Sequence, residues 1–165
     1  MASIIAVIGF RKSGKTTIIR ELLHSLGDKV VIIKDIHDYG QEFDSRNKDT
    51  WIFSREGAYA VVGLAPDKTH ILVNSPIELN EVIQLMLNVV KPRYVILEGF
   101  KNKIKDRGDV IKIITLRSID ELSELANGVK PPMLVYCGFC GCNINGCISS
   151  MDQLVNAVLR IINEH

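Results

Sequence analysis

A glycine-rich segment near the N-terminus has the residue types and spacing of a phosphate-binding loop. Residues Gly9 to Thr16 read Gly-Phe-Arg-Lys-Ser-Gly-Lys-Thr and fit the pattern G-x-x-x-x-G-K-T at every position. Glycine permits the tight turn in which successive backbone N–H groups surround a phosphate. A helix starting at Lys15 would direct its positive end toward the same anion. The segment therefore predicts binding of a nucleoside triphosphate.

Each polar residue of this segment has an expected role. Lys15 would neutralise the β- and γ-phosphates, and the Thr16 hydroxyl would be a ligand of Mg²⁺. The residues expected to contact the nucleotide belong to the loop and to the first helical turn: Gly9, Arg11, Lys12, Ser13, Gly14, Lys15, Thr16 and Thr17.

Two carboxylates are candidates for the Mg²⁺-linked acid that accompanies such a loop. Glu98 follows the apolar run Tyr94 to Leu97, where a carboxylate costs free energy unless a cation or water partners it. Asp35 ends another apolar run, Lys29 to Lys34. Either acid would bind Mg²⁺ or orient the attacking water, so Glu98 and Asp35 join Lys15 as candidate catalytic residues. The sequence does not rank the two acids.

All four cysteines of the chain lie close together, at Cys137, Cys140, Cys142 and Cys147. Glycines and asparagines surround them, and these residues favour turns. Such a backbone can fold four thiolates around one Zn²⁺ ion or an Fe–S cluster. The spacing fits neither standard pattern closely, so disulfide pairing and free thiols remain alternatives. Metal binding is the favoured hypothesis.

Apolar runs and helical periodicity predict the elements that position these groups. Strands are expected at residues 3–9, 29–34, 58–64, 70–73, 94–97, 110–116 and 133–136, and helices at 15–26, 49–56, 76–90, 118–126 and 150–162. The close strands at 58–64 and 70–73 favour an antiparallel pair, and the basic segment 101–107 is expected to be a solvated loop.

We expect one domain over residues 1–165, with a Cys-rich loop at 137–147 and a C-terminal helix. Its fold class is α/β, a P-loop NTPase-like three-layer fold whose mostly parallel sheet carries an antiparallel β insertion.

Composition narrows the functional classes. The formal charge of +1 gives no overall attraction to nucleic acid. The apolar N-terminus lacks the leading positive charges of a signal peptide, and no apolar run approaches the roughly 18 residues of a membrane span. We therefore expect a cytoplasmic protein that binds neither nucleic acid nor membrane.

Five segments in order resemble the molybdopterin-guanine dinucleotide biosynthesis protein B (MobB) family, over about residues 3–117. They are Gly9–Thr17, Ile33–Asp38, Lys48–Thr50, Arg55–Ala58 and Leu97–Lys101. The resemblance implies a dimeric P-loop GTPase-like domain that binds GTP, hydrolyses it weakly, and assists the nucleotidyltransferase that attaches GMP to molybdopterin. The preference for guanine rests on the resemblance alone, because no Asn-Lys-x-Asp segment is present.

The chain departs from the family pattern in two places. The family typically has Lys-His-x-His-His after the second strand, whereas this chain has Lys34-Asp35-Ile36-His37-Asp38. Only His37 is kept, and it is a candidate for contact with the nucleotide or a pterin. The tail after Leu116, which holds the cysteines, is absent from the short form of the family.

Two other classes of protein, small-molecule kinases and nucleotide-switched metallo-chaperones or scaffolds, contain the same kind of loop. A small-molecule kinase would need an acceptor pocket and an arginine-rich lid over the phosphates. A metallo-chaperone or scaffold would use the nucleotide only to switch conformation. Phosphate transfer to a small acceptor would favour the kinase, and nucleotide-dependent release of a bound metal would favour the chaperone.

Overall fold

The computed structural model describes residues 2–38, 48–141 and 145–164. The chain divides into two compact units. The first unit combines Met1–Asp35 with Ile83–His165, and the second is the uninterrupted stretch Ile36–Val82. The expectation of a single domain over residues 1–165 stays a prediction.

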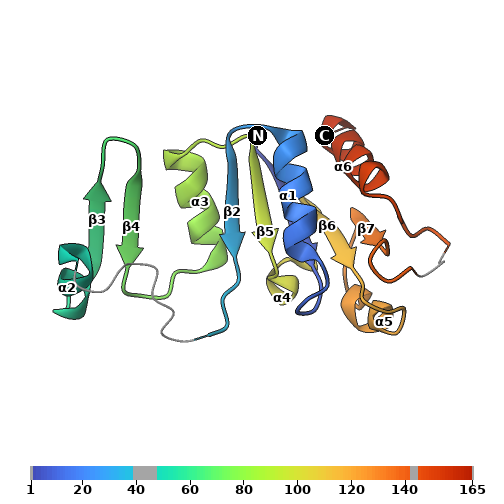
Figure 1. Ribbon diagram of the computed structural model, residues 1–165, viewed down its shortest axis with the longest axis horizontal. Coiled ribbons are helices and arrows are strands. Elements are labelled where there is room, and N and C mark those ends of the chain that lie inside the picture. The colour runs from blue at the N-terminus through green and yellow to red at the C-terminus, as the bar shows by residue number, and fades with distance from the viewer. Residues whose placement is uncertain (1, 39–47, 142–144, 165) are drawn as a thin grey trace. The chain divides into compact units, whose positions relative to one another are not determined.

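The first unit is built on a five-stranded parallel sheet (Figure 1). Its strands are β1 (Ser3–Ile8), β2 (Val30–Lys34), β5 (Tyr94–Glu98), β6 (Val110–Thr115) and β7 (Met133–Tyr136), in the order β2-β5-β1-β6-β7. Parallel strands end at a common edge, and the register pairs Val7 of β1 with Glu98 of β5. The end of β1, where the glycine-rich loop begins, therefore lies beside the carboxylate that ends β5.

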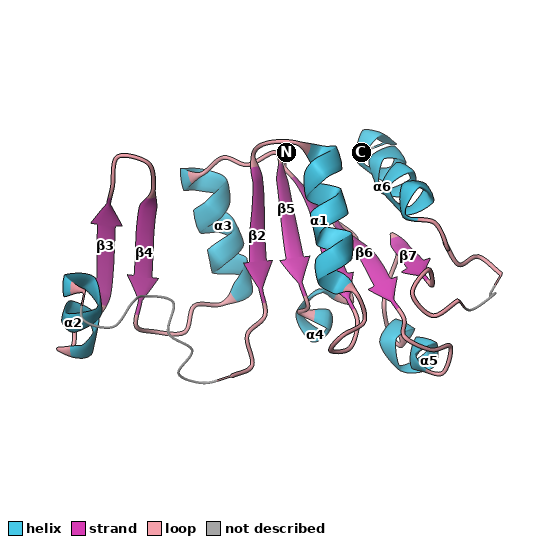
Figure 2. Ribbon diagram, in the orientation of Figure 1, coloured by secondary structure: helices cyan, strands magenta, loops and turns pink. Residues whose placement is uncertain are grey.

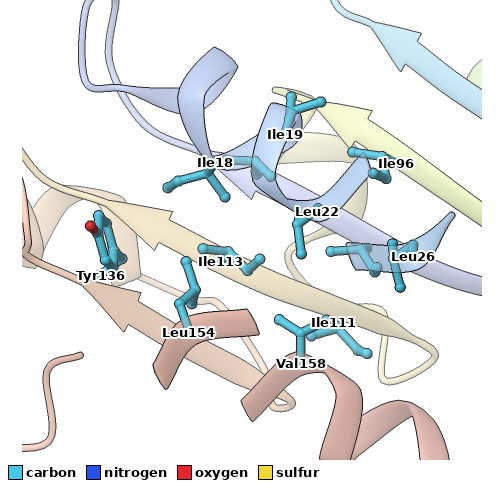
Figure 3. Close-up of a cluster of buried hydrophobic side chains, with 12 residues drawn as sticks. Ile18, Ile19, Leu22, Leu26, Ile96, Ile111, Ile113, Tyr136, Leu154 and Val158 are labelled. Carbon is cyan, nitrogen blue, oxygen red and sulfur yellow. The ribbon is translucent and has the colours of Figure 1, made fainter. Parts of the chain in front are cut away.

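The core of the first unit lies between this sheet and two helices, α1 (Lys15–Leu26) and α6 (Met151–Glu164) (Figure 3). Both helices are amphipathic: Ile18 and Leu22 of α1 and Leu154 of α6 are buried against the inner residues of the strands. Alternate strand residues point to opposite faces of a sheet. The intervening residues of β1, Ile4, Ala6 and Ile8, are also buried, so both faces are covered and the unit has three layers, as predicted.

Two short helices complete the first unit, α4 (Lys101–Ile104) and α5 (Glu121–Ala126). α4 lies in the basic segment that was predicted to be a solvated loop. The prediction was wrong because Ile104, the apolar residue among these lysines, is fully buried and anchors a helical turn. The N–H groups of Lys103 and Ile104 donate to the carbonyl of Phe100, which closes that turn.

The second unit contains α2 (Asp49–Arg55) and the antiparallel pair β3 (Ala60–Leu64) and β4 (Thr69–Val73) (Figure 2). Gly63 of β3 faces Thr50 of α2, so α2 packs on one face of the hairpin. Val62, Leu64 and Ile71 lie on the other face, because Val62 pairs with Ile71 and Leu64 is two residues from Val62. These three side chains are 58%, 81% and 52% exposed. We call them the exposed hairpin face.

The helix α3 (Leu79–Val89) spans the boundary between the units and starts three residues later than the sequence pattern suggested. The Glu81 carboxylate accepts a hydrogen bond from the Glu78 N–H, which is the reciprocal half of a capping box. The helix therefore begins after Glu78 rather than at Pro76. Within the described ranges, no helix combines the length and apolar composition needed to cross a membrane.

Candidate functional site

The glycine-rich loop connects the end of β1 to the start of α1 and turns sharply on the way. Lys12 and Gly14 have positive φ angles, 63° and 87°. A Cβ on Gly9 would lie 2.4 Å from Ser13 Oγ and 2.8 Å from the Thr115 carbonyl oxygen. No side chain can be accommodated at position 9 without moving the backbone of β6. The glycines of the pattern are therefore required by close packing and by backbone conformation.

Lys15, the first residue of α1, folds back along the loop. Its ammonium donates hydrogen bonds to the carbonyls of Gly9 (2.9 Å) and Phe10 (2.8 Å). Burial lowers the pKa of Lys15, and the nearby Glu98 carboxylate opposes that shift. A partly desolvated ammonium next to a carboxylate gains free energy from an additional anion. Lys15 is thus suited to neutralise a phosphate, as the sequence predicts.

Ser13 contributes a hydroxyl that the rest of the protein does not satisfy. Its side chain is 1% exposed, and among the described residues its Oγ is buried without a hydrogen-bond partner. A buried hydroxyl with no partner costs free energy. Its position inside the loop makes it available to a polar ligand.

A cavity of about 430 Å³ opens at the loop, lined by residues 11–16 and by Glu98. The Glu98 side chain is mostly buried and lies 3.7 Å from the Lys34 ammonium. Arg11, Lys12 and Lys15 contribute three cations to the lining. The cavity is therefore a cationic cradle with one carboxylate in its lining, and this charge distribution is complementary to that of a phosphate–Mg²⁺ group.

Two residues at the end of β6 hold the loop in place, and the sequence analysis did not identify them. The Thr115 hydroxyl donates to the Ser13 carbonyl at 2.7 Å in a buried position. The Arg117 guanidinium donates to the Arg11 carbonyl at 3.3 Å and lies 5.4 Å from the centre of the Phe10 ring. Only the parallel pairing of β6 with β1 brings these residues to the loop. No local pattern marks them, because they are about 100 residues distant in sequence.

The remaining predicted residues are placed differently. Asp35 accepts a hydrogen bond from the Phe100 N–H through Oδ2 at 3.3 Å, and its own N–H donates to the Glu98 carbonyl. It therefore supports the turn after β5 and is not among the residues that line the cavity. His37 belongs to the second unit and is exposed. Thr17 lies on the exposed side of the first turn of α1.

The cysteines adopt a different arrangement from the predicted metal site. Cys137 and Cys147 form a disulfide, Cys140 is disulfide-bonded as well, and Cys142 lies outside the described residues. Two sulfurs joined in a disulfide are no longer thiolates and do not ligate Zn²⁺ or iron as thiolates do. Across the described ranges, no three His, Cys, Asp or Glu side chains form a group able to hold a metal ion. Disulfide pairing, the second alternative, is the arrangement found.

The loop residues fit a nucleotide phosphate. Ser13, Gly14 and Lys15 line the cavity, and the Ser13 hydroxyl is unsatisfied among the described residues. Thr16 and Glu98 fit Mg²⁺, which takes one or two protein oxygens and keeps several waters. Together with the order of the parallel strands, this loop defines a P-loop NTPase-like fold.

Comparison with known proteins gives the family. Residues 4–125 match the MobB family, described as "Molybdopterin guanine dinucleotide synthesis protein B". A putative molybdopterin-guanine dinucleotide biosynthesis adapter protein of Methanocaldococcus jannaschii is 30% identical over 163 residues, covering 85% of this chain and 68% of the relative. The chain belongs to the MobB family, whose role lies in molybdopterin guanine dinucleotide biosynthesis. The resemblance seen in the sequence is confirmed.

Solved MobB structures share the fold. The MobB of Bacillus subtilis has a TM-score of 0.69 at 20% identity, with 96% of each chain covered. A MobB homologue of Bacillus stearothermophilus has a TM-score of 0.68 at 14% identity, covering 98% of this chain and 99% of the other. The α/β fold class with its small antiparallel sheet is therefore confirmed.

Proposed function

We propose that this protein is a GTP-binding accessory protein, with weak GTPase activity, that assists formation of molybdopterin guanine dinucleotide. The single observation that carries the proposal is the cationic cradle at Gly9–Thr16, where Ser13, with its unsatisfied hydroxyl, and Lys15 line a cavity in a member of the MobB family. The relative from M. jannaschii is named as an adapter. An adapter role agrees with a site built mainly for binding.

Different residues of the site would bind the phosphates and the Mg²⁺ ion. The loop N–H groups and the positive end of α1 bind the phosphates, and Lys15 balances their charge. Thr16 and Glu98 are the residues that would hold Mg²⁺, which supplies charge neutralisation between the phosphates when bound. Glu98 is the better candidate for the acid because it lines the cavity, whereas Asp35 holds the turn at Phe100. Asp35 then acts by keeping Glu98 in position.

The proposed assembly is a homodimer that also contacts the nucleotidyltransferase. Val62, Leu64 and Ile71 form an apolar surface that is more than half exposed. Apolar patches of this kind mark protein–protein contacts. We assign this face to the contact between the two subunits.

A calorimetric titration with Mg–GTP and Mg–ATP, followed by analysis of the products, tests the proposal. Lys15→Ala is expected to weaken Mg–GTP binding at least about tenfold, because a phosphate-facing cation is lost. Arg20→Ala is the matched control, since Arg20 is an exposed cation further along α1. Equal affinities for wild type and Lys15→Ala, with the fold intact, would exclude the loop as the binding site. Transfer of the γ-phosphate to a small acceptor would favour the kinase instead.

A further inference from the structure

The ring of Phe139, in the Cys-rich loop, packs directly on the phosphate loop. A Cβ placed on Gly14 would lie 2.1–2.8 Å from three carbons of this ring. The ring therefore occupies the space that a side chain at position 14 would fill, in contact with the N-terminal cap of α1. Gly14 and Phe139 are far apart in sequence, and β7 brings them together because it runs parallel to β6 in the sheet that contains β1.

The position of Phe139 is set by its neighbours in the Cys-rich loop. Tyr136 contacts the Phe139 ring edge to face, with the ring centres 5.1 Å apart. Cys137 is 1% exposed and donates its N–H to the Ile148 carbonyl at 2.9 Å. The disulfide with Cys147 closes the loop on its other side. Phe139 thus extends from a segment that is fixed at both ends.

We propose that Phe139 is a positioning residue for the phosphate loop, and that the Cys137–Cys147 disulfide makes this support depend on thiol redox state. The inference rests on the proposed nucleotide binding. Gly14 has a left-handed conformation, and its N–H group belongs to the set that surrounds the phosphate. A ring packed against its Cα limits the movement of that turn. Phosphate affinity then falls when the ring is removed or released.

A dithiol is the class of reductant that would release the ring. Its thiolate attacks one sulfur of the Cys137–Cys147 disulfide and displaces the other as a thiolate, giving a mixed disulfide. The second thiol of the reductant then displaces the protein sulfur, and the reductant leaves as a cyclic disulfide. Two electrons pass to the protein, and two protons end on the Cys137 and Cys147 thiols. Opening the cross-link restores conformational freedom to the segment that carries Phe139.

The test is a set of titrations with two ligands, Mg–GTP and Mg–tripolyphosphate, which share the phosphates but not the base. Phe139→Ala is expected to lower the affinity for both ligands by the same factor. That factor is about threefold to tenfold, which corresponds to the free energy of one aromatic contact. Phe139→Tyr keeps the ring and is expected to restore wild-type affinity. Phe53→Ala is the control, since Phe53 is an exposed phenylalanine of α2 in the second unit.

Redox dependence is measured on the same proteins. Dithiothreitol, which also reduces the disulfide of Cys140, is expected to weaken the binding of both ligands to the wild type by about the factor seen for Phe139→Ala. It should change the affinities of Phe139→Ala little, because reduction and the substitution act through the same contact. Cys147→Ser cannot form the disulfide and should show the same loss of affinity in the absence of dithiothreitol. Thermal unfolding of each variant verifies that the first unit remains folded.

The outcomes separate the inference from the function on which it rests. Equal Mg–GTP affinity in the oxidised wild type, the reduced wild type and Phe139→Ala would overturn the inference and leave the proposed function standing. A loss confined to Mg–GTP would also overturn it, since the ring would then contact the base. No binding of Mg–GTP by the oxidised wild type would overturn both.

Discussion

The parallel sheet of the first unit and the hairpin of the second have similar apolar sequences and opposite environments. In β1, Ile5, Ala6 and Val7 are fully buried, whereas Val62, Leu64 and Ile71 of the hairpin are more than half exposed. Helices α1 and α6 pack on one face of the sheet, and the residues of β1 on its other face are buried as well, whereas α2 covers one face of the hairpin. Apolar residues in the sheet therefore stabilise the fold, and those on the exposed hairpin face remain available for association.

The difference in burial also determines where the chemistry lies. A phosphate site needs backbone groups held in fixed positions, and the buried strands β1, β5 and β6 provide them. The hairpin has few polar side chains and no cavity-lining residue among those described. The proposed nucleotide site therefore lies in the first unit, and the proposed subunit contact lies in the second.

The largest expected effect comes from a cavity mutation in the first unit. Ile113→Ala removes a fully buried side chain from the core and should lower the free energy of unfolding by about 2–5 kcal/mol. Ile71→Ala makes the same change at a residue of the exposed hairpin face, where a value within about 0.5 kcal/mol is expected for the monomer. Chemical denaturation at a concentration that disfavours association measures both. Equal losses of unfolding free energy in the two variants would contradict the difference in burial between the parallel sheet and the exposed hairpin face.

A charge on the exposed hairpin face tests association directly. Val62→Asp buries a carboxylate in the proposed dimer contact and should raise the dimer dissociation constant more than about tenfold. Asp67→Ala, in the turn between β3 and β4, is a control at an exposed polar position. Light scattering after size-exclusion chromatography gives the mass, and the affinity for Mg–GTP should not change. An unaltered dimer would place the subunit contact elsewhere.

Glu98→Gln separates the two candidate acids. The amide keeps the shape of the side chain and removes its charge, so Mg²⁺-dependent affinity or hydrolysis should fall by about tenfold while stability is preserved. Asp35→Asn should have the smaller effect, because Asp35 accepts a hydrogen bond at the turn rather than lining the cavity. Measurements of GTP hydrolysis over a range of Mg²⁺ concentrations compare them. The reverse ranking would assign the metal-linked role to Asp35.

The smallest expected effect comes from Arg117, which contacts the phosphate loop from the end of β6. Arg117→Ala removes a cation–π contact with Phe10 and a hydrogen bond to the Arg11 carbonyl. A partly exposed contact of this kind contributes about 0.5–1 kcal/mol, so Mg–GTP affinity should fall twofold to fivefold, by about that free energy. Arg160→Ala, on the exposed side of α6, is the control. No change in a calorimetric titration would show that Thr115 suffices.

The sequence predicted those parts of the site that local pattern determines. The phosphate loop follows from one contiguous motif, the range of α1 from helical periodicity, and the five parallel strands from apolar runs. Thr115, Arg117 and Phe139 could not be predicted, because they reach the loop only through the order of the parallel strands. The start of α3 was misplaced, since a glutamate side chain set it rather than the proline. The disulfide was one of three open alternatives, as spacing does not determine thiol chemistry.

The second unit is one continuous stretch of chain, so its sequence and length can vary without interrupting the strands of the first unit. Both of its ends, Ile36 and Val82, join the first unit. None of the strands of the parallel sheet lies in this stretch, so insertions or deletions before α3 leave the order β2-β5-β1-β6-β7 unaltered. The residues that line the cavity all lie outside this stretch, so a change in the length or sequence of the stretch leaves the lining of the proposed nucleotide site intact.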